Sequence, residues 1–319
     1  MSKKFVKPPS FTSRKGAGTT PAAVIRSMRL VFFAVLTLGT PVSSWAAPAD
    51  EALRALALIP KFDFSRLSDS AKRELATVLS DEFDYCGRPL TLMATLRKDD
   101  ACSHTKRLVA LAAAMAAEGS AASDIVVALG RYHQGFTGKR HAFKTNAAMC
   151  LGPADAKVTL VEFADYTCPH CAAARPILEN IVKAKKDVRL CFMAFPLSNT
   201  GESTAAVKAA FFAREKGKFW PMHDFIFEHQ LSLSDKVLKD HGARLGLDAA
   251  GLSKALVGET YNEEIEASRQ AGRSAGVEST PTVFINGRKL GLSTVTENLS
   301  TAIDDELEWL VNNQSWNRR

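Results

Sequence analysis

Two cysteines separated by two residues constrain this chain more than any other feature of its sequence. The motif Cys168-Pro169-His170-Cys171 follows an apolar run over residues 158–163 and opens an amphipathic stretch over residues 172–184. This order predicts a strand, a short turn and a helix whose first turn carries Cys168. The first turn of a helix presents unpaired backbone N–H groups and the positive end of the dipole, and both favour a thiolate. The motif therefore predicts a redox-active dithiol.

Half of a zinc site is the alternative for a Cys-x-x-Cys pair. A structural zinc ion needs four ligands, usually with a second pair of Cys or His at short spacing. The other cysteines stand singly in the sequence, at Cys86, Cys102, Cys150 and Cys191. The sequence therefore favours redox chemistry, and we expect neither a metal ion nor another cofactor.

The basic charge of the chain is concentrated at its start. The formal net charge is +7, and residues 1–29 contain seven Lys and Arg and no acidic residue. Those seven account for the whole net charge, so the rest of the chain is neutral. A neutral remainder lacks the basic surface that is typical of proteins that bind nucleic acid.

The basic start leads into an apolar run over residues 30–38, which is followed by small residues. This order is typical of a secretory signal peptide, and the apolar run is short for a bilayer span. We expect residues 1–46 to be the signal, with cleavage after Ala46 or Ala49, and Met28 is a second candidate for the true start. An uncleaved anchor is the alternative. Six cysteines in an exported chain indicate an oxidising compartment, so a periplasmic or secreted protein is expected.

Two hydrophobic patterns divide the exported part into two domains. Residues 47–141 show helical periodicity and predict a small all-α domain, in which Ser68 and Ser70 are candidate caps of one helix and Ser123 of another. Residues 142–319 alternate apolar runs with helical stretches and predict an α/β layer with helices on both faces. The last apolar run of this layer turns at Asn286-Gly287, which is a strong hairpin signal.

Three motifs in the second half resemble the DsbA-like branch of the thioredoxin superfamily. They lie at residues 161–171, around the two cysteines, at residues 218–228 and at residues 279–287. The resemblance implies a thioredoxin fold interrupted by a helical insertion. It also implies dithiol–disulfide exchange on secreted proteins.

The resemblance assigns roles to individual residues. Cys168 falls on the nucleophile of the family and Cys171 on its resolving cysteine. Glu162 falls on the buried acid that assists proton movement at the resolving thiol; an acid paired with a lysine on an ordinary strand is the alternative. Pro281 falls on the cis-proline that faces the disulfide, and Thr280 precedes it. The backbone beside Pro281 is expected to pair with an extended substrate chain.

His170 lies between the two cysteines of the motif. We expect it to favour the oxidised form by donating to the sulfur of Cys168 or by placing positive charge near it. A passive surface histidine is the alternative.

The remaining cysteines suggest structural bonds. Cys86 and Cys102 lie in one helical module of an exported protein, where a structural disulfide is expected and a second redox pair is the alternative. For Cys150 and Cys191 two interpretations stay open, a bridge from the entry segment to the second strand and a pair of buried free thiols.

These features together predict an exported thiol–disulfide oxidoreductase that forms disulfides in folding secreted polypeptides with Cys pairs. A membrane or soluble redox partner is expected to recycle it. A disulfide isomerase or reductase of the same fold is an alternative, because Thr280 and the extra N-terminal domain are compatible with it. A metallochaperone that holds Cu(I) on the two thiolates is an alternative from another class.

Overall fold

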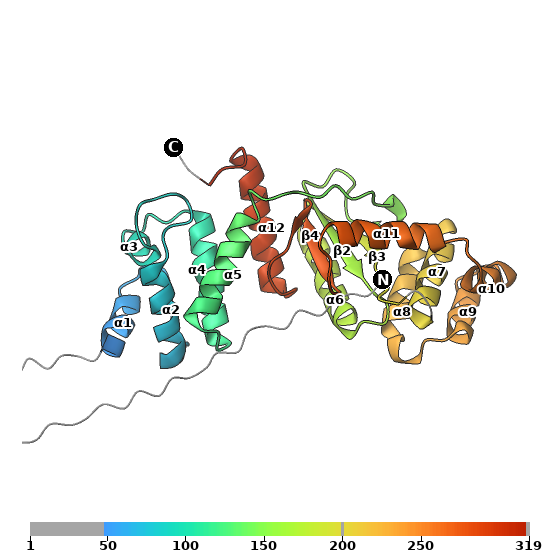
Figure 1. Cartoon of the computed structure of the whole chain (residues 1–319), viewed down its shortest axis with the longest axis horizontal. Helices are drawn as coiled ribbons and strands as arrows, with labels where there is room; N and C mark the ends of the chain where they lie inside the picture. The colour runs from blue at the N-terminus through green and yellow to red at the C-terminus, as the bar shows by residue number, and fades with distance from the viewer. Residues whose placement is uncertain (1–47, 199–200, 317–319) are drawn as a thin grey trace, which may run out of the picture. The chain divides into compact units, whose positions relative to one another are not determined.

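A five-stranded sheet runs through the second half of the chain (Figure 1). The computed structural model describes residues 48–198 and 201–316. The strands lie in the order β1-β3-β2-β4-β5, with β2 and β3 parallel and the other pairs antiparallel. Their bounds are Cys150–Leu151 for β1, Val158–Ala164 for β2, Val188–Ala194 for β3, Thr282–Ile285 for β4 and Arg288–Lys289 for β5.

Helices cover both faces of this sheet, which explains why β2 and β3 are buried along almost their whole length. Successive residues of a strand point to opposite faces. Leu160 packs in one core cluster with residues of α6 (Pro169–Ala184) and α12 (Thr296–Val311), whereas Phe163 packs in another with residues of α11 (Asn262–Ser274). The alternation puts Glu162 on the same face as Leu160, which is the face that α6 covers.

The predicted helical insertion lies between β3 and β4. Its helices are α7 (Glu202–Glu215), α8 (Phe219–Glu228), α9 (Asp235–Arg244), α10 (Ala249–Val257) and α11. Tyr166 and Cys171, on either side of the start of α6, belong to the same core cluster as the apolar residues of α7 to α10. The insertion therefore packs directly against the segment that carries the cysteine motif. The predicted fold class, a thioredoxin fold with a helical insertion after an all-α region, is confirmed.

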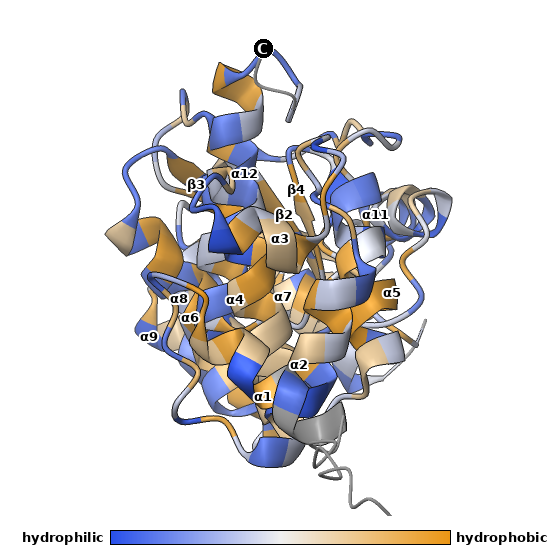
Figure 2. Cartoon of the chain, turned by 90° about the vertical axis from the view of Figure 1, so that its left-hand side faces the viewer, coloured by the Kyte–Doolittle hydropathy of each residue, from blue (hydrophilic) through white to orange (hydrophobic). Residues whose placement is uncertain are grey.

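From residue 48 onward, five α-helices precede the sheet. They are α1 (Pro48–Ala57), α2 (Asp69–Asp81), α3 (Leu92–Arg97), α4 (Ser103–Ala117) and α5 (Ala122–Gln134). Figure 2 shows hydrophilic and hydrophobic segments interleaved along α1 and α2, as in amphipathic helices. The hydroxyl of Ser68 caps α2 as predicted, accepting a hydrogen bond from the backbone N–H of Ala71 at 3.2 Å, whereas Ser70 is not a cap because it lies inside the first turn of the helix.

The predicted cap at Ser123 is wrong. Helix α5 begins two residues earlier than that cap predicts, so Ser123 lies inside its first turn, and Ala121 at the N-cap has no side-chain cap. The Glu74 carboxylate of α2 accepts a hydrogen bond from the backbone N–H of Ala122 at 2.7 Å. A side chain of a neighbouring helix therefore satisfies one of the free backbone N–H groups at the start of α5.

A buried carboxylate on α12 gathers polar side chains from α4 and α5. Asp305 is fully buried; it lies 2.9 Å from Nδ1 of His104, accepts from the Arg107 guanidinium at 2.6 Å, and accepts from the Tyr132 hydroxyl at 2.8 Å. A buried charge is stable only when it is paired and hydrogen-bonded, and these contacts supply both conditions. They tie the helices of residues 47–141 to the last helix of the chain. The division at residue 141 into two domains remains a prediction.

The structure contains two disulfide bonds outside the motif. Cys86 and Cys102 are joined, which confirms the predicted structural bond. Cys150 and Cys191 face each other across the β1–β3 pair and are also joined, which decides between the two interpretations of this pair.

The helices of residues 48–198 and 201–316 all lack the length and apolar character needed to cross a membrane. The predicted signal over residues 1–46 lies outside the described residues.

Replacing Asp305 with asparagine is expected to lower the free energy of unfolding by about 3 kcal/mol, because a buried charge that accepts from several side chains is lost and Arg107 keeps only its ion pair with Glu308. Urea unfolding at constant pH measures the change. Glu259→Gln, at an exposed position, is the matched control and should change stability by no more than about 0.5 kcal/mol. Equal stability of the two variants would contradict the role assigned to Asp305.

Removing the Cys86–Cys102 bond by a double substitution to alanine is expected to destabilise the protein by about 3 kcal/mol, because the bond closes a loop across 16 positions. The unfolding midpoint in urea, measured without reductant, tests this. An unchanged midpoint would show that the bond contributes nothing to the folded state.

Candidate active site

Cys168 lies at the junction between β2 and α6. It is the N-cap residue of α6, with φ −85° and ψ 117°, and Pro169 follows at the first helical position, where the missing N–H of proline costs nothing. The Cys168 side chain is half-buried, and its thiol donates to the backbone carbonyl of Thr280 at 3.3 Å. The sulfur of Cys168 therefore lies at the positive end of the α6 dipole and is partly accessible to solvent.

The segment opposite Cys168 is the start of the hairpin. The peptide bond between Thr280 and Pro281 is cis, as the family resemblance predicted. The structure thus brings Thr280 and Pro281 beside the sulfur of Cys168, more than a hundred residues away in the sequence.

Cys171 is the third residue of α6, within its first turn, and is fully buried. Burial raises the pKa of its thiol well above the ordinary value, and the Glu162 carboxylate adds to this effect at the alkaline pH where it is ionised. Cys171 therefore favours the protonated thiol, whereas Cys168 lies at the exposed end of the pair. Both cysteines are free thiols in the structure.

Glu162 is buried beneath the motif, on the face of β2 that α6 covers. Only 3 % of it is exposed, and its Oε1 has no hydrogen-bond partner within the described residues. Burial raises its pKa to about 8, with the charge of Glu179 as a second cause. The alternative of an ordinary strand acid paired with a lysine does not hold, because no lysine or arginine of residues 48–198 and 201–316 pairs with it. Glu162 therefore carries a proton at neutral pH.

His170 is exposed at the start of α6. In the described part of the chain it forms no hydrogen bond, so its influence on the sulfur of Cys168 stays a prediction.

Two residues that the sequence analysis did not single out hold the loop before the motif. The buried carboxylate of Asp165 accepts from the backbone N–H groups of Thr167 and Leu197, both at 2.7 Å, and from the Ser203 hydroxyl at 2.7 Å. The Gln230 amide donates to the carbonyl oxygens of Tyr166 and Cys168 at 2.7 and 3.0 Å. The sequence signal that could have indicated Asp165 is its position, as an acidic residue directly after a buried strand. Gln230 had no such signal, because only the fold of the insertion brings it to the loop.

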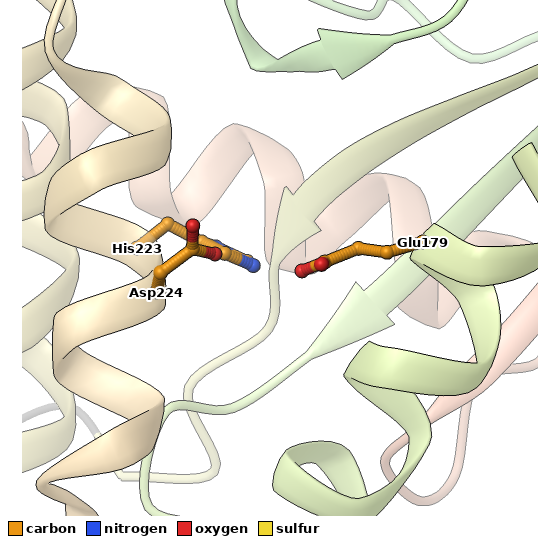
Figure 3. Close-up of side chains that lie close together, drawn as sticks. All are labelled: Glu179, His223 and Asp224. Atoms are coloured by element: carbon orange, nitrogen blue, oxygen red, sulfur yellow. The ribbon is translucent and has the colours of Figure 1, made fainter. Parts of the chain in front are cut away.

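A cluster of potential metal ligands lies where α6 meets α8. Figure 3 shows Glu179 of α6 pointing toward His223 and Asp224 of α8, and their ligand atoms lie within 4.8 Å of one another. The guanidinium of Arg175 already provides a cation there, since it donates to Glu179 at 3.4 Å and to Asp224 at 3.1 Å. Burial lowers the pKa of His223 to about 3, so its imidazole is neutral, and Nδ1 forms a 3.0 Å hydrogen bond with the Tyr166 hydroxyl.

Comparison with known proteins identifies the family. Residues 144–305 match a family model described as thioredoxin. The chain belongs to the thioredoxin family. The thioredoxin fold and the DsbA-like resemblance predicted from the sequence are confirmed.

Similar proteins include two kinds of curated relative. The Na⁺/H⁺ antiporter NhaA 3 of Salinispora tropica is 34% identical over 139 residues, which are 43% of this chain and 21% of the antiporter. Disulfide bond formation protein D of Bacillus subtilis is 25% identical over 169 residues, which are 50% of this chain and 76% of that protein. The chain thus spans about a fifth of the antiporter's length and about three quarters of protein D.

Solved structures with a similar fold include oxidised BdbD from Bacillus subtilis. It is 22% identical, with a TM-score of 0.47, over 54% of this chain and all of that one. Wolbachia pipientis α-DsbA1 is 18% identical, with a TM-score of 0.45, over 52% of this chain and 94% of its own.

Glu162→Gln is expected to stabilise the reduced protein at neutral pH. The pKa of Glu162 is raised from 4.5 to about 8 in the folded protein. Below pH 4.5 the carboxyl is protonated in both the folded and the unfolded state, so its stabilising contribution is fully present. As pH rises toward 8 that contribution is lost, because only the unfolded state releases the proton. Each pH unit between these two pKa values corresponds to about 1.4 kcal/mol in the free energy of unfolding. Urea unfolding at several pH values should therefore show an advantage of the variant that grows between pH 4.5 and 8 and is constant above it. An advantage that does not change with pH would refute the burial of a protonated carboxyl.

Proposed function

We propose that this chain is an exported thiol–disulfide oxidoreductase that forms disulfide bonds in secreted polypeptides. The observation that carries the proposal is the asymmetry of the two thiols: Cys168 is half-buried at the start of α6, and Cys171 is buried behind it. One sulfur is accessible to a substrate, and the other is held where it can only close or open the internal bond. The relative named for disulfide bond formation supports the same chemistry.

The reaction begins with the oxidised pair. A substrate thiolate attacks the sulfur of Cys168, a mixed disulfide forms, and the bond between Cys168 and Cys171 breaks with its electron pair on Cys171. That sulfur takes a proton, because its buried site favours the thiol. The second substrate thiolate then attacks the substrate sulfur of the mixed disulfide, and Cys168 leaves as a thiolate. The substrate loses two electrons and the enzyme gains them.

The direction of exchange depends on which form of the pair the protein stabilises. The positive end of α6 stabilises a thiolate at Cys168, a charge that the disulfide form cannot carry. Stabilising the reduced form makes the disulfide a stronger oxidant, so the geometry favours disulfide formation over reduction.

Glu162, Thr280 and Pro281 have supporting roles in the proposal. Glu162 supplies the proton that Cys171 takes as the internal bond breaks, since it is buried next to that thiol and carries a proton at neutral pH. The backbone at Thr280 and Pro281 lies beside Cys168 and is suited to pair with an extended chain, which gives low sequence specificity.

The site of action follows from the sequence. Residues 1–46 act as the export signal, and residues 47–141 and 142–319 reach the periplasm or the exterior as a helical domain and a thioredoxin-fold domain. A redox partner in that compartment reoxidises the pair, and folding polypeptides with Cys pairs are the substrates.

Oxidation of a reduced model protein tests the activity. The oxidised protein should catalyse disulfide formation, and Cys168→Ser should abolish it because the nucleophile is lost. Cys171→Ser should lose turnover but still form mixed disulfides through Cys168, which non-reducing electrophoresis detects. The Cys86→Ala/Cys102→Ala double variant is the matched control and should keep the activity.

The reduction potential of the pair separates an oxidase from a reductase. A value well above the thioredoxin range, about −270 mV, agrees with disulfide formation as the direction. A value in that range would reject the oxidase and leave a reductase of the same fold.

A further inference from the structure

A hollow lies between the segment that precedes β1 and helix α11. Its volume is about 500 Å³, which is within the range of pockets that hold small molecules. Residues 144–149 contribute one wall and α11 the other, while β3 and α7 contribute the base. Cys168, Cys171 and Pro281 are not part of its lining, so the proposed function gives the hollow no role.

The base of the hollow is apolar. It is lined by four buried side chains, which are those of Met149, Phe192, Met193 and Phe211. Phe192 and Met193 are neighbours on β3, which runs beyond its pairing with β1 at Cys191. The hollow therefore lies at the edge of the sheet, and an apolar group bound there would be removed from water.

Helix α11 presents small side chains to the hollow. Its lining residues are Glu264, Ala267, Ser268 and Ala271, which recur at i, i+3, i+4 and i+7 and so lie on one face of the helix. Ala267 and Ala271 end at Cβ and therefore leave a space between the helix and the base.

The hydroxyl of Ser268 is a buried polar group in this lining. Ser268 is 9 % exposed, and its Oγ has no hydrogen-bond partner among the described residues. A buried hydroxyl without a partner costs free energy, and most buried polar groups in proteins have one. The hollow therefore calls for a hydrogen-bonding group that the chain itself does not supply there.

The charged residues of the lining leave one cation uncompensated. Glu264 accepts from Nη2 of Arg214 at 2.9 Å, so its charge is balanced by an ion pair. Lys144 is exposed on the opposite wall and forms no ion pair within the part of the chain that the structure describes. The hollow therefore favours a ligand with a negative charge.

The wall that carries Lys144 is held at both ends. Before it, the backbone N–H of His141 donates to the carbonyl of Gly287 at 2.8 Å. After it, Cys150 is joined to Cys191 of β3. A wall fixed in this way forms the hollow before any ligand arrives, which lowers the entropy cost of binding.

We propose that the hollow binds a small amphipathic monocarboxylate, whose carboxylate lies between the Lys144 ammonium and the Ser268 hydroxyl. Its apolar body lies on Phe192, Met193 and Phe211. A carboxylate accepts hydrogen bonds from both an ammonium and a hydroxyl. The inference goes beyond the proposed function and does not depend on thiol–disulfide exchange.

Calorimetric titration with two probes tests the site. Decanoate has an aliphatic body and 2-naphthylacetate an aromatic one, and at least one of them should bind saturably with one molecule per chain. The amide 2-naphthylacetamide keeps the apolar body of the second probe but has no charge. It should bind roughly tenfold more weakly than that probe, because hydrogen bonds to charged groups are the stronger ones.

Variants of the two polar residues locate the carboxylate. Ser268→Ala should weaken binding of the better probe by roughly tenfold, because a buried hydrogen bond to a charged group is lost. Lys144→Gln should weaken it by about threefold, since an exposed ion pair contributes less. Lys254→Gln is the matched control, because it removes the same charge from an exposed position on α10. It should bind the probe as tightly as the unaltered protein does.

A bulky side chain at the edge of the hollow tests the position of the apolar body. Ala267 is exposed and lines the hollow, so Ala267→Trp should block it and abolish binding without disturbing the core. Gln270 is exposed on the same helix but does not line the hollow. Gln270→Trp is therefore the matched control and should keep the affinity. Urea unfolding checks that both variants are folded.

Three results would overturn the proposal. One is the absence of saturable binding for both carboxylates below the concentrations at which they form micelles or aggregates. Another is equal affinity for 2-naphthylacetate and its amide, which would leave an apolar hollow with no preference for an anion. The third is unchanged affinity in Ala267→Trp, which would place the probe elsewhere on the surface. Thiol exchange is measured separately, so its failure would reject the proposed function and leave the carboxylate site standing.

Discussion

The turn from β2 into α6 decides the chemical character of both thiols. Cys168 precedes the first helical residue and reaches solvent, whereas Cys171, three residues on, has already turned inward beneath the insertion helices. One sulfur meets the dipole of the helix and the other meets the apolar core. Asp165 and Gln230 fix the loop that makes this turn, so the difference between the two sulfurs is built into the backbone.

Two buried acidic residues of this chain differ in the hydrogen-bond partners of their carboxyl groups. Asp305 is surrounded by donors from His104, Arg107 and Tyr132, and it joins helices that are distant in sequence. Glu162 is as well buried, but its Oε1 has no partner among the described residues. An unpaired buried carboxyl costs free energy and takes up a proton instead of holding a charge. Asp305 therefore stabilises the fold, and Glu162 retains the capacity to exchange a proton.

Local pattern was enough to predict much of this fold, including the strand before the motif and the hairpin at Asn286-Gly287. Family resemblance, rather than spacing, placed Glu162 and Pro281 at the site. The cap of α5 was missed because Glu74 of another helix supplies it. The contacts of Gln230, Arg175 and Asp305 were missed for the same reason. Each depends on elements that are distant in sequence, and neither periodicity nor capping rules report on such pairs.

The contacts of Asp305 also mean that α4 and α5 cannot complete their packing before α12 has been made. His104 and Asp305 are 201 positions apart, and α12 is the last helix that the structure describes. During synthesis, α4 and α5 emerge long before the carboxylate that receives their polar side chains. These two helices therefore remain without their buried ion pair until α12 has been made, and a chain truncated before α12 would leave a histidine and an arginine without their acid.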